Sequence, residues 1–197
     1  MSTARKEQST RLKGLRVAIV ATEGFEQVEL FKPKEALEAA GAHVDVISPK
    51  AGIKSGKIKG WNMTDWGDSV KVDVELSHAK EAKYDALVLP GGVMNPDKLR
   101  MDADAVAFIK SFATNNKPIA AICHGAWTLI EADAVRGRTM TSWPSLQTDL
   151  KNAGAQWVDR EVVEDNGLIT SRKPDDLPAF IQRMIDVFGT VAHHAAA

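Results

Sequence analysis

The sequence predicts an α/β fold in which a mainly parallel sheet lies between two layers of helices. Short β-branched runs alternate with segments of helical periodicity, which is the order found in βαβ units. The central runs are uniformly apolar, as strands covered on both faces are. A chain of 197 residues also suits one hydrophobic core, because a second core becomes favoured only beyond about 250 residues. We therefore expect one domain.

The N-terminal part has the pattern of a βαβ unit. LRVAIVA (15–21) and HVDVISP (43–49) are predicted strands. Between them, VELFKPKEALEAAG (28–41) is a predicted helix that Gly41 closes. Pro33 is expected early in that helix, where its missing N–H matters less, or else to kink the first turn.

The next segment, residues 50–77, interrupts the alternation of strands and helices. Glycines break it at Gly52, Gly56, Gly60 and Gly67. Within its last part, VKVDVEL (70–76) alternates apolar and polar residues, as a half-exposed strand does. We expect a small hairpin excursion from the main sheet here.

Two buried strands and their helices follow. YDALVLPGG (84–92) is a strand that runs into a Gly-Gly turn, and PIAAIC (118–123) is uniformly apolar. Between them, DADAVAFIKSFATNNK (102–117) begins with a capping aspartate and has apolar residues at helical spacing. GAWTLIEADAV (125–135) is the next predicted helix.

The C-terminal part predicts a strand, a helix, a hairpin and a closing helix. These are TMTSW (139–143), SLQTDLKNAG (145–154), REVVEDNGLITS (160–171) with its turn at Asn166-Gly167, and the amphipathic DDLPAFIQRMIDVF (175–188). We place the single domain at residues 15–189, between a disordered extension at 1–14 and a frayed tail at 190–197.

The composition narrows the classes of function. Lys+Arg 25 balance Asp+Glu 26, so no global field favours nucleic acid or an anionic membrane surface, and we expect neither partner. The one cysteine cannot form an internal disulfide, and a free thiol is easiest to maintain in a reducing compartment. We expect no export signal in the polar N-terminus, and the first apolar segment is too short to span a bilayer. These features predict a cytoplasmic protein.

The carboxyl ends of the parallel strands define the expected site, because ligands bind at that edge of an open α/β sheet. Three strand ends contribute to it: Glu23, Glu26 and Glu29 follow the first, Gly91 and Gly92 the second, and Cys123 and His124 the third. A thiol, an imidazole, carboxylates and unhindered backbone amides are the components of a nucleophile site with an oxyanion hole.

Cys123 lies where a strand turns sharply into a helix. This is the geometry of a nucleophile elbow, which lifts the side chain clear of the sheet at some backbone strain, and Gly125 supports such a turn. The positive end of a helix dipole favours an anion, so we expect the pKa of the thiol to fall below its reference of about 8.5. The alternative is a packing role, since free cysteines are among the most buried residues. The position at the polar end of a strand favours reactivity.

The histidine and the glutamates have ordinary alternatives too. Adjacent residues on extended backbone point to opposite faces, so His124 pairs with Cys123 only if the chain bends. The backbone N–H groups of His124 and Gly92 are better placed to stabilise an oxyanion. Glu26 and Glu29 are either charges that complement a helix N-terminus or, on one helical face, carboxyls that hydrogen-bond the sulfur or relay a proton.

Five blocks of the sequence carry a family resemblance: FEQVELFKP, YDALVLPGG, KPIAAICHGAW, VRGRTMTSWPSLQTDLKNAGAQWVD and EVVEDNGLITSRKPDDLPAF. In this order, over residues 15–188, they resemble the PfpI family of class I glutamine-amidotransferase-like proteins, which includes intracellular cysteine peptidases, general-stress proteins and protein deglycases. The resemblance implies a flavodoxin-like three-layer sandwich, a nucleophile at Cys123 beside His124, and a carboxylate at Glu29 that contacts the sulfur, with Glu26 nearby. It also implies a homodimer or a homohexamer.

The loop after the Gly-Gly turn departs from the peptidase-type pattern. In those members a glutamate of a neighbouring subunit orients the histidine, and the matching residue here is Asp97, which is shorter by one methylene. The loop is also longer by one residue near Asn95, which changes the reach to His124. The stress-protein and deglycase members are closer at this position, which favours a small carbonyl substrate over a peptide. Trp127, after Ala126 where the family often has proline, is expected to reshape the pocket wall or to pack in the core.

The expected function is that of a cysteine-dependent stress-response enzyme on reactive carbonyls. It would hydrolyse methylglyoxal or its early adducts on a protein or peptide, as glyoxalase III and protein deglycases do, with Cys123 as nucleophile and Glu29 and His124 transferring protons. The alternatives are a PfpI-type intracellular cysteine peptidase and a non-catalytic redox sensor or chaperone-like protein that uses oxidation of Cys123. No cofactor or metal is expected, since His43 and His78 have no partners at metal-ligand spacing.

Overall fold

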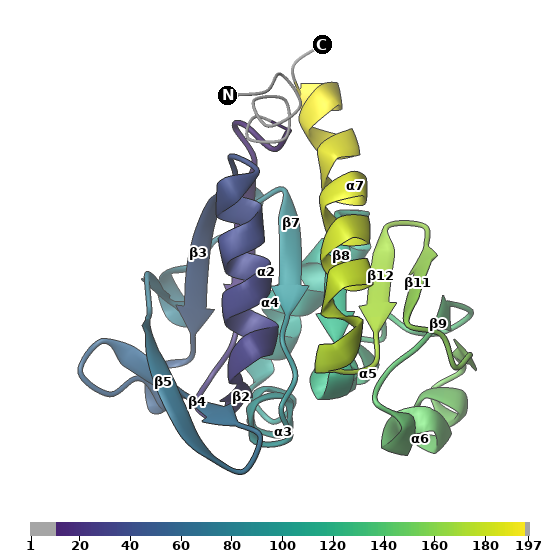
Figure 1. Cartoon of the computed structure of the whole chain (residues 1–197), viewed down its shortest axis with the longest axis horizontal. Helices are drawn as coiled ribbons and strands as arrows, with labels where there is room; N and C mark the ends of the chain where they lie inside the picture. The colour runs from purple at the N-terminus through teal and green to yellow at the C-terminus, as the bar shows by residue number, and fades with distance from the viewer. Residues whose placement is uncertain (1–10, 196–197) are drawn as a thin grey trace.

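The computed structural model describes residues 11–195, and the side chains of residues 11–191. The strands of its main sheet are β1 (Arg16–Val20), β3 (His43–Ser48), β6 (Val74–Glu75), β7 (Ala86–Leu89), β8 (Ile119–Ile122), β11 (Val162–Asp165) and β12 (Leu168–Ser171). They lie in the order β11-β12-β8-β7-β1-β3-β6, and every neighbouring pair is parallel except β11 and β12. Helices cover both faces (Figure 1). The fold is the flavodoxin-like three-layer α/β sandwich that the sequence predicts.

The helices form two layers on the sheet. Their bounds are α2 (Gln27–Ala39), α3 (Met94–Leu99), α4 (Ala103–Thr114), α5 (Ala126–Glu131), α6 (Gln147–Asn152) and α7 (Leu177–Ala195). In the view of Figure 1, α2 and α7 lie side by side on the near face, and α4 and α5 lie behind the sheet. Single 3-10 turns join several elements: η1 (Lys50–Gly52), η2 (Leu76–His78), η3 (Glu81–Lys83), η4 (Cys123–Gly125), η5 (Pro144–Leu146) and η6 (Pro174–Asp176).

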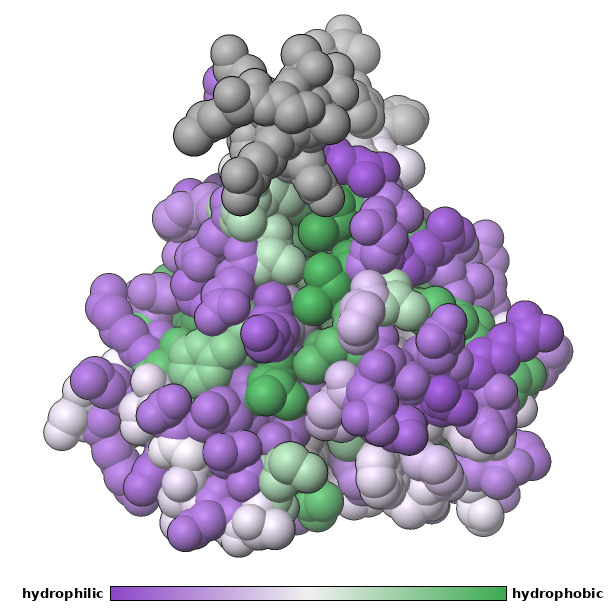
Figure 2. Space-filling view, viewed as in Figure 1, coloured by the Kyte–Doolittle hydropathy of each residue, from purple (hydrophilic) through white to green (hydrophobic). Residues whose placement is uncertain are grey.

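The core has two halves, one on each face of the sheet. Alternate residues of β1 divide between them, since Ile19 packs in the half under α2 and α7, whereas Val20 packs in the half under α4 and α5. Both side chains are fully buried. Apolar side chains also follow the seam between α2 and α7, framed by hydrophilic ones (Figure 2). Burial on both faces explains why the central strands are uniformly apolar.

The predicted hairpin excursion exists and forms a small second sheet. It consists of β4 (Lys57–Asn62) and β5 (Asp65–Lys71), which pair antiparallel, with β2 (Phe25–Glu26) added parallel to β4. The predicted strand at 70–76 is divided, because β5 ends at Lys71 and β6 pairs with β3 in the main sheet. A third, two-stranded sheet pairs β9 (Thr139–Met140) with β10 (Gln156–Trp157).

The turns and caps follow the sequence signals closely. The Asp102 carboxylate accepts hydrogen bonds from the N–H groups of Asp104 and Ala105, each at 3.0 Å, and so caps α4. The β11–β12 turn has φ 47° at Asn166 and 82° at Gly167, which is the conformation that Asn-Gly favours in two-residue hairpins.

Three boundaries differ from the prediction. Leu12 is fully buried and its N–H donates to the Ala40 carbonyl at 2.9 Å, so ordered structure includes residues 11–14; residues 1–10 of the expected extension lie outside the described part. At the other end, α7 continues to Ala195 instead of fraying from residue 190. Pro33 lies in the middle of α2, because this helix begins directly after β2. Its missing N–H leaves the Glu29 carbonyl without the usual helical partner.

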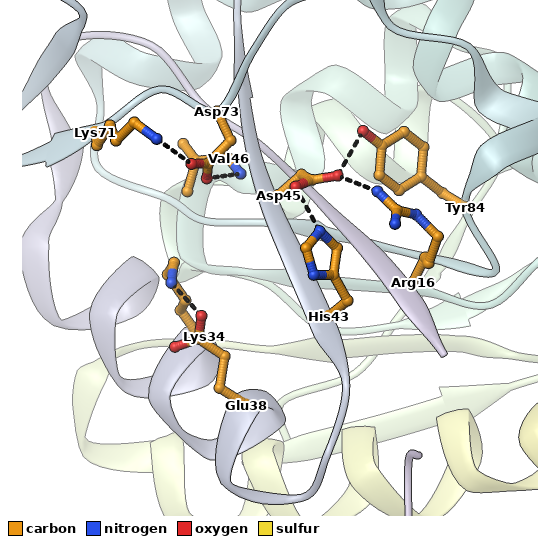
Figure 3. Close-up of polar contacts among 9 residues, drawn as sticks. All are labelled: Arg16, Lys34, Glu38, His43, Asp45, Val46, Lys71, Asp73 and Tyr84. Atoms are coloured by element: carbon orange, nitrogen blue, oxygen red, sulfur yellow. Dashed lines mark hydrogen bonds and ion pairs between the residues drawn. The ribbon is translucent and has the colours of Figure 1, made fainter. Parts of the chain in front are cut away.

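A polar cluster joins the amino ends of β1 and β3. Asp45 on β3 is buried and accepts hydrogen bonds from Arg16 Nη2 at 2.8 Å and from the Tyr84 hydroxyl at 3.0 Å, and His43 Nε2 lies 3.0 Å from its second oxygen (Figure 3). Burial and the Asp45 carboxylate raise the pKa of Tyr84 to about 12. This cluster is at the sheet edge opposite to the carboxyl ends of the strands.

Candidate active site

The chain turns abruptly at Cys123. Ile122 ends β8 in an extended conformation, and Cys123 has φ 61°, an uncommon value for a residue other than glycine. Such strain costs on the order of 1–3 kcal/mol and persists where the surroundings impose it. A Cβ atom on Gly125 would lie 2.5 Å from the Leu89 carbonyl oxygen, so the turn packs too closely against β7 for any larger residue. The elbow predicted from the sequence is present.

The turn brings the Cys123 and His124 side chains to the same side. Cys123 Sγ lies 3.2 Å from His124 Nδ1, although the two residues are adjacent. His124 stacks on Trp143, with ring centroids 5.8 Å apart and planes at 24°, and its Nε2 lies 3.5 Å from Ser145 Oγ. Burial lowers the pKa of His124 to about 4, so the imidazole is neutral at pH 7.

Glu29 is a fully buried carboxyl on α2, close to the thiol. Its Oε2 accepts a hydrogen bond from the Gly91 N–H at 2.9 Å, and its Oε1 has no hydrogen-bond partner among the described residues. Burial, and then the nearby Glu26, raise the pKa of Glu29 to about 8. Glu29 therefore holds a proton at pH 7 in most molecules.

The thiol of Cys123 differs from the expectation of a lowered pKa. Burial, and then the charge of Glu29, raise the pKa of Cys123 above its ordinary value, while the N–H groups of His124 and Gly92 act in the opposite direction. A lowered pKa requires an exposed thiol at the N-terminus of a helix. Cys123 is instead 7% exposed, and it begins the 3-10 turn η4, which precedes α5. The resting residue is a neutral thiol beside a neutral carboxyl.

The Gly91-Gly92 turn must lack side chains to fit between the other groups. A Cβ atom on Gly91 would lie 2.5 Å from Glu29 Oε2 and 2.6 Å from Cys123 Cβ. Gly92 has φ 77°, and a Cβ atom there would lie 2.6 Å from the Gly24 carbonyl oxygen. The lack of side chains in this turn lets Glu29 and Cys123 approach closely enough for a side-chain hydrogen bond between them.

Asn95 holds this turn in place. It is fully buried on α3, and its Nδ2 donates to the carbonyl oxygens of Pro90 at 2.9 Å and Gly91 at 3.2 Å. Its Oδ1 accepts a hydrogen bond from the Thr22 N–H at 2.7 Å. One amide therefore joins the carboxyl end of β1 to the Gly-Gly turn. The sequence shows only that the loop is longer near Asn95, so this role had to come from the structure.

The Cys123 side chain lines a pocket of about 590 Å³. Its lining consists of Glu26, Glu29, Trp61, Met63, Gly92, Val93, Met94, Cys123, His124, Trp143 and Pro174. The sequence analysis missed the apolar members of this set. Trp61 and Met63 come from the hairpin excursion, whose relation to the strand ends cannot be read from spacing. Trp143 was detectable in principle, because it is the last residue of the predicted strand TMTSW.

Glu26 connects the hairpin to the strand ends. It is 9% exposed, its backbone N–H donates to the Gly91 carbonyl at 3.2 Å, and its Oε1 accepts a hydrogen bond from the Met63 N–H at 3.4 Å. Burial raises the pKa of Glu26, against the effect of the Met63 hydrogen bond. The predicted nearness of Glu26 to Glu29 is present.

Four of the expected residues lie outside the pocket lining, and the first is Gly91, whose N–H is directed to Glu29. Glu23 forms an ion pair with Lys54 at 2.9 Å. Trp127 packs edge-on behind His124 with ring centroids 5.0 Å apart, and its Nε1 donates to Asp149 Oδ2 at 3.0 Å, so it supports the histidine. Asp97 is exposed on α3. Its expected contact is with His124 of a neighbouring subunit, and this stays a prediction.

Other site types receive no support from the described residues. Within residues 11–191, no three His, Cys, Asp or Glu side chains gather in an arrangement that could hold a metal ion. In the same described part, no helix has the length and apolarity needed to cross a membrane.

Known proteins with the same elements support a family assignment. Residues 15–187 match the DJ-1/PfpI family. Uncharacterised proteins of Staphylococcus epidermidis and Staphylococcus aureus are 43% identical over 172 residues, which is 86% of this chain and 95% and 96% of theirs. A two-domain protein of Anabaena variabilis with DJ-1/ThiJ/PfpI-like and ferritin-like domains superimposes with a TM-score of 0.82 at 35% identity, over 89% of this chain and 48% of that one. Drosophila melanogaster DJ-1beta gives 0.78 at 25% identity, over 93% and 98% of the two chains. The chain belongs to the DJ-1/PfpI family.

Proposed function

We propose that the protein is a cysteine-dependent enzyme that hydrolyses α-oxoaldehydes such as methylglyoxal, or their early adducts on amines and thiols. One observation carries the proposal: the Cys123 thiol lines a pocket beside the Glu29 carboxyl, which has a pKa of about 8, and its Sγ lies 3.2 Å from the neutral imidazole of His124. A group with a pKa near the working pH is suited to take up and return a proton.

The first step is addition of the thiol to the aldehyde. The Cys123 Sγ–C1 bond forms, the C1–O π bond breaks, and the thiol proton passes by way of His124 Nδ1 to the former aldehyde oxygen. The product is a hemithioacetal. The N–H groups of Gly92 and His124 stabilise negative charge at the sulfur while it is the nucleophile.

The second step moves a proton between the two carbons of the bound hemithioacetal. The ionised fraction of Glu29 removes the C1 proton and returns it to C2, while the C1 hydroxyl proton passes to the C2 oxygen, which gives a thioester. Water then breaks the C1–Sγ bond, and the products are a 2-hydroxy acid and the free thiol. The reaction consumes one water and no other co-reactant.

Purified variants test this proposal directly. Cys123→Ala should abolish 2-hydroxy acid formation from methylglyoxal. Glu29→Gln should lower kcat by at least about a hundredfold, because general acid–base groups contribute about 10²–10⁴ in rate. A glycated amino acid assayed in parallel distinguishes adduct from free aldehyde. Turnover retained in Cys123→Ala protein would eliminate the proposal.

A redox sensor is the second candidate, favoured by the unpartnered Oε1 of Glu29 beside the thiol. An oxygen added to Sγ by a peroxide could accept the carboxyl proton there, and one water is released for each oxygen transferred. Peptide mapping after mild peroxide treatment tests this candidate, and mapping is needed because Met63 and Met101 are exposed and also gain oxygen. Modification of these methionines before Cys123 would count against a sensor.

A further inference from the structure

The charge of the pocket limits what it can hold. Its lining carries the carboxyls of Glu26 and Glu29 and includes neither lysine nor arginine. A carboxylate or phosphate group on a ligand would lose its water without gaining a cation, and it would lie beside Glu26. The pocket is therefore suited to neutral ligands.

The walls of the pocket are apolar and larger than a three-carbon aldehyde requires. The apolar residues of the lining are Trp61, Met63, Val93, Met94, Trp143 and Pro174. A volume of about 590 Å³ falls within the range of about 300–1,000 Å³ that holds drug-sized ligands. Methylglyoxal would leave most of these walls in contact with water.

Three of the apolar residues that line the pocket are also exposed to solvent. Met63 is 77% exposed, Val93 55% and Trp143 37%. Clustered exposed side chains of this kind mark sites that a ligand covers.

The hairpin tip that carries two of these walls is held in place by several contacts. Trp61 Nε1 donates to the Met63 carbonyl at 2.9 Å, the Met63 N–H donates to Glu26, and Trp66 packs edge-on against Trp61 with ring centroids 5.6 Å apart. Trp61 and Met63 are therefore presented to the pocket in a defined position.

We propose that the preferred substrates are neutral α-oxoaldehydes with an aromatic or bulky aliphatic substituent, and that anionic aldehydes such as glyoxylate are rejected. The aldehyde carbon lies at Cys123 and the substituent packs against Trp61, Met63 and Trp143. This inference rests on the proposed function for its reaction, but the selectivity of the pocket can be measured without turnover.

Alkylation of the single cysteine measures that selectivity. Rates with iodoacetamide, iodoacetate and N-phenyl iodoacetamide are followed by intact mass and divided by the rates with glutathione. We expect the phenyl reagent to be favoured over iodoacetamide by about tenfold or more, because its aromatic ring buries apolar surface against the pocket walls. Iodoacetate should be disfavoured by about tenfold. Ratios equal to those of glutathione would overturn the inference.

Variants assign the selectivity to the hairpin tip. Met63→Ala and Trp61→Ala should each lower the ratio of the phenyl rate to the iodoacetamide rate severalfold, because each removes an apolar wall of the pocket. Met101→Ala is the matched control, because Met101 is 83% exposed and lies outside the pocket lining. A preference that survives both hairpin variants would refute the role of these walls.

Turnover separates this inference from the proposed function. Phenylglyoxal should exceed methylglyoxal in kcat/KM by about tenfold, and the ratio should fall in Met63→Ala. Selective alkylation with no turnover of either aldehyde would refute the proposed function and leave the pocket's selectivity standing. Equal kcat/KM values for the two aldehydes would refute the substrate class alone.

Discussion

The protonation states of Glu29, Cys123 and His124 follow from burial more than from their charges. Each side chain is less than 10% exposed, and burial is the largest cause of the shift in the pKa of all three. Burial favours the neutral form of an acid and of a base alike. The site therefore holds two acids that keep their protons and one base that stays neutral, so a proton moves among them only when a substrate arrives.

Glu29 should make the stability of the protein depend on pH. Its pKa is about 8 in the folded protein and 4.5 when unfolded, so the folded state retains a proton that the unfolded state releases. Its stabilising contribution is complete below pH 4.5 and is lost as the pH rises towards 8, by roughly 5 kcal/mol at most. Urea unfolding between pH 4.5 and 8 should show this decline relative to Glu29→Gln, whose amide does not titrate.

His124 gives the opposite dependence, which provides the control. Its folded pKa of about 4 is below the ordinary 6.5, so its contribution is present above pH 6.5 and is lost as the pH falls towards 4. His124→Asn should remove the loss of stability at low pH and should leave the loss of stability at high pH that is due to Glu29. Parallel stability profiles for wild type and Glu29→Gln would contradict a raised pKa for Glu29.

Asn95 should couple the stability of the Gly-Gly turn to the reactivity of Cys123. Asn95→Ala removes the side-chain partner of the Thr22 N–H and of the Pro90 carbonyl and leaves the Gly91 carbonyl only its bond from the Glu26 N–H, which should cost about 2–4 kcal/mol of unfolding free energy. The Gly91 N–H then loses its fixed direction towards Glu29, so the pH profile of Cys123 alkylation should shift. A purely structural role would lower stability and leave that pH profile unchanged.

The elements differ in how much of them the sequence could predict. Strands β1, β7 and β8, the Asn166-Gly167 turn and the elbow at Cys123 depend on local patterns, and all of them occur as predicted. The position of the hairpin tip depends on a contact between Glu26 and Met63, far apart in the chain. The pKa of the thiol depends on burial, which is a property of the assembled fold. The sequence could therefore indicate the candidate site residues, but it could not predict the contacts and the burial of these residues in the folded protein.

The closing helix α7 contains a glycine, a residue that disfavours helical structure. Gly189 lies inside the helix, and a Cβ atom there would have no neighbour closer than 3.6 Å. Gly189→Ala should therefore raise the unfolding free energy by about 0.5–1 kcal/mol through helix propensity. Thermal unfolding measures the change as a higher Tm. Gly137→Ala is the contrasting variant, since it has open space but φ 75°, and it should destabilise.

The whole molecule separates a functional edge of the sheet from a structural one. The carboxyl ends of the strands carry strained backbone at Cys123, buried acids and the open pocket. The amino ends carry the cluster in which the Asp45 carboxylate is paired with Arg16, Tyr84 and His43. Strain at one edge is tolerated because the remaining contacts over-determine the fold.

This separation predicts that the two edges can be perturbed independently. Asp45→Asn removes the negative charge that pairs with Arg16 and replaces one of the two acceptor oxygens by an NH₂ group, and it should lower the unfolding free energy by about 2 kcal/mol. Cys123 alkylation rates and their pH profile should not change. Asn95→Ala should lower stability by a similar amount and change both. If Asp45→Asn altered Cys123 reactivity as strongly as Asn95→Ala, the two edges would be coupled through β1 and β3, and the pocket could not be treated as an independent unit.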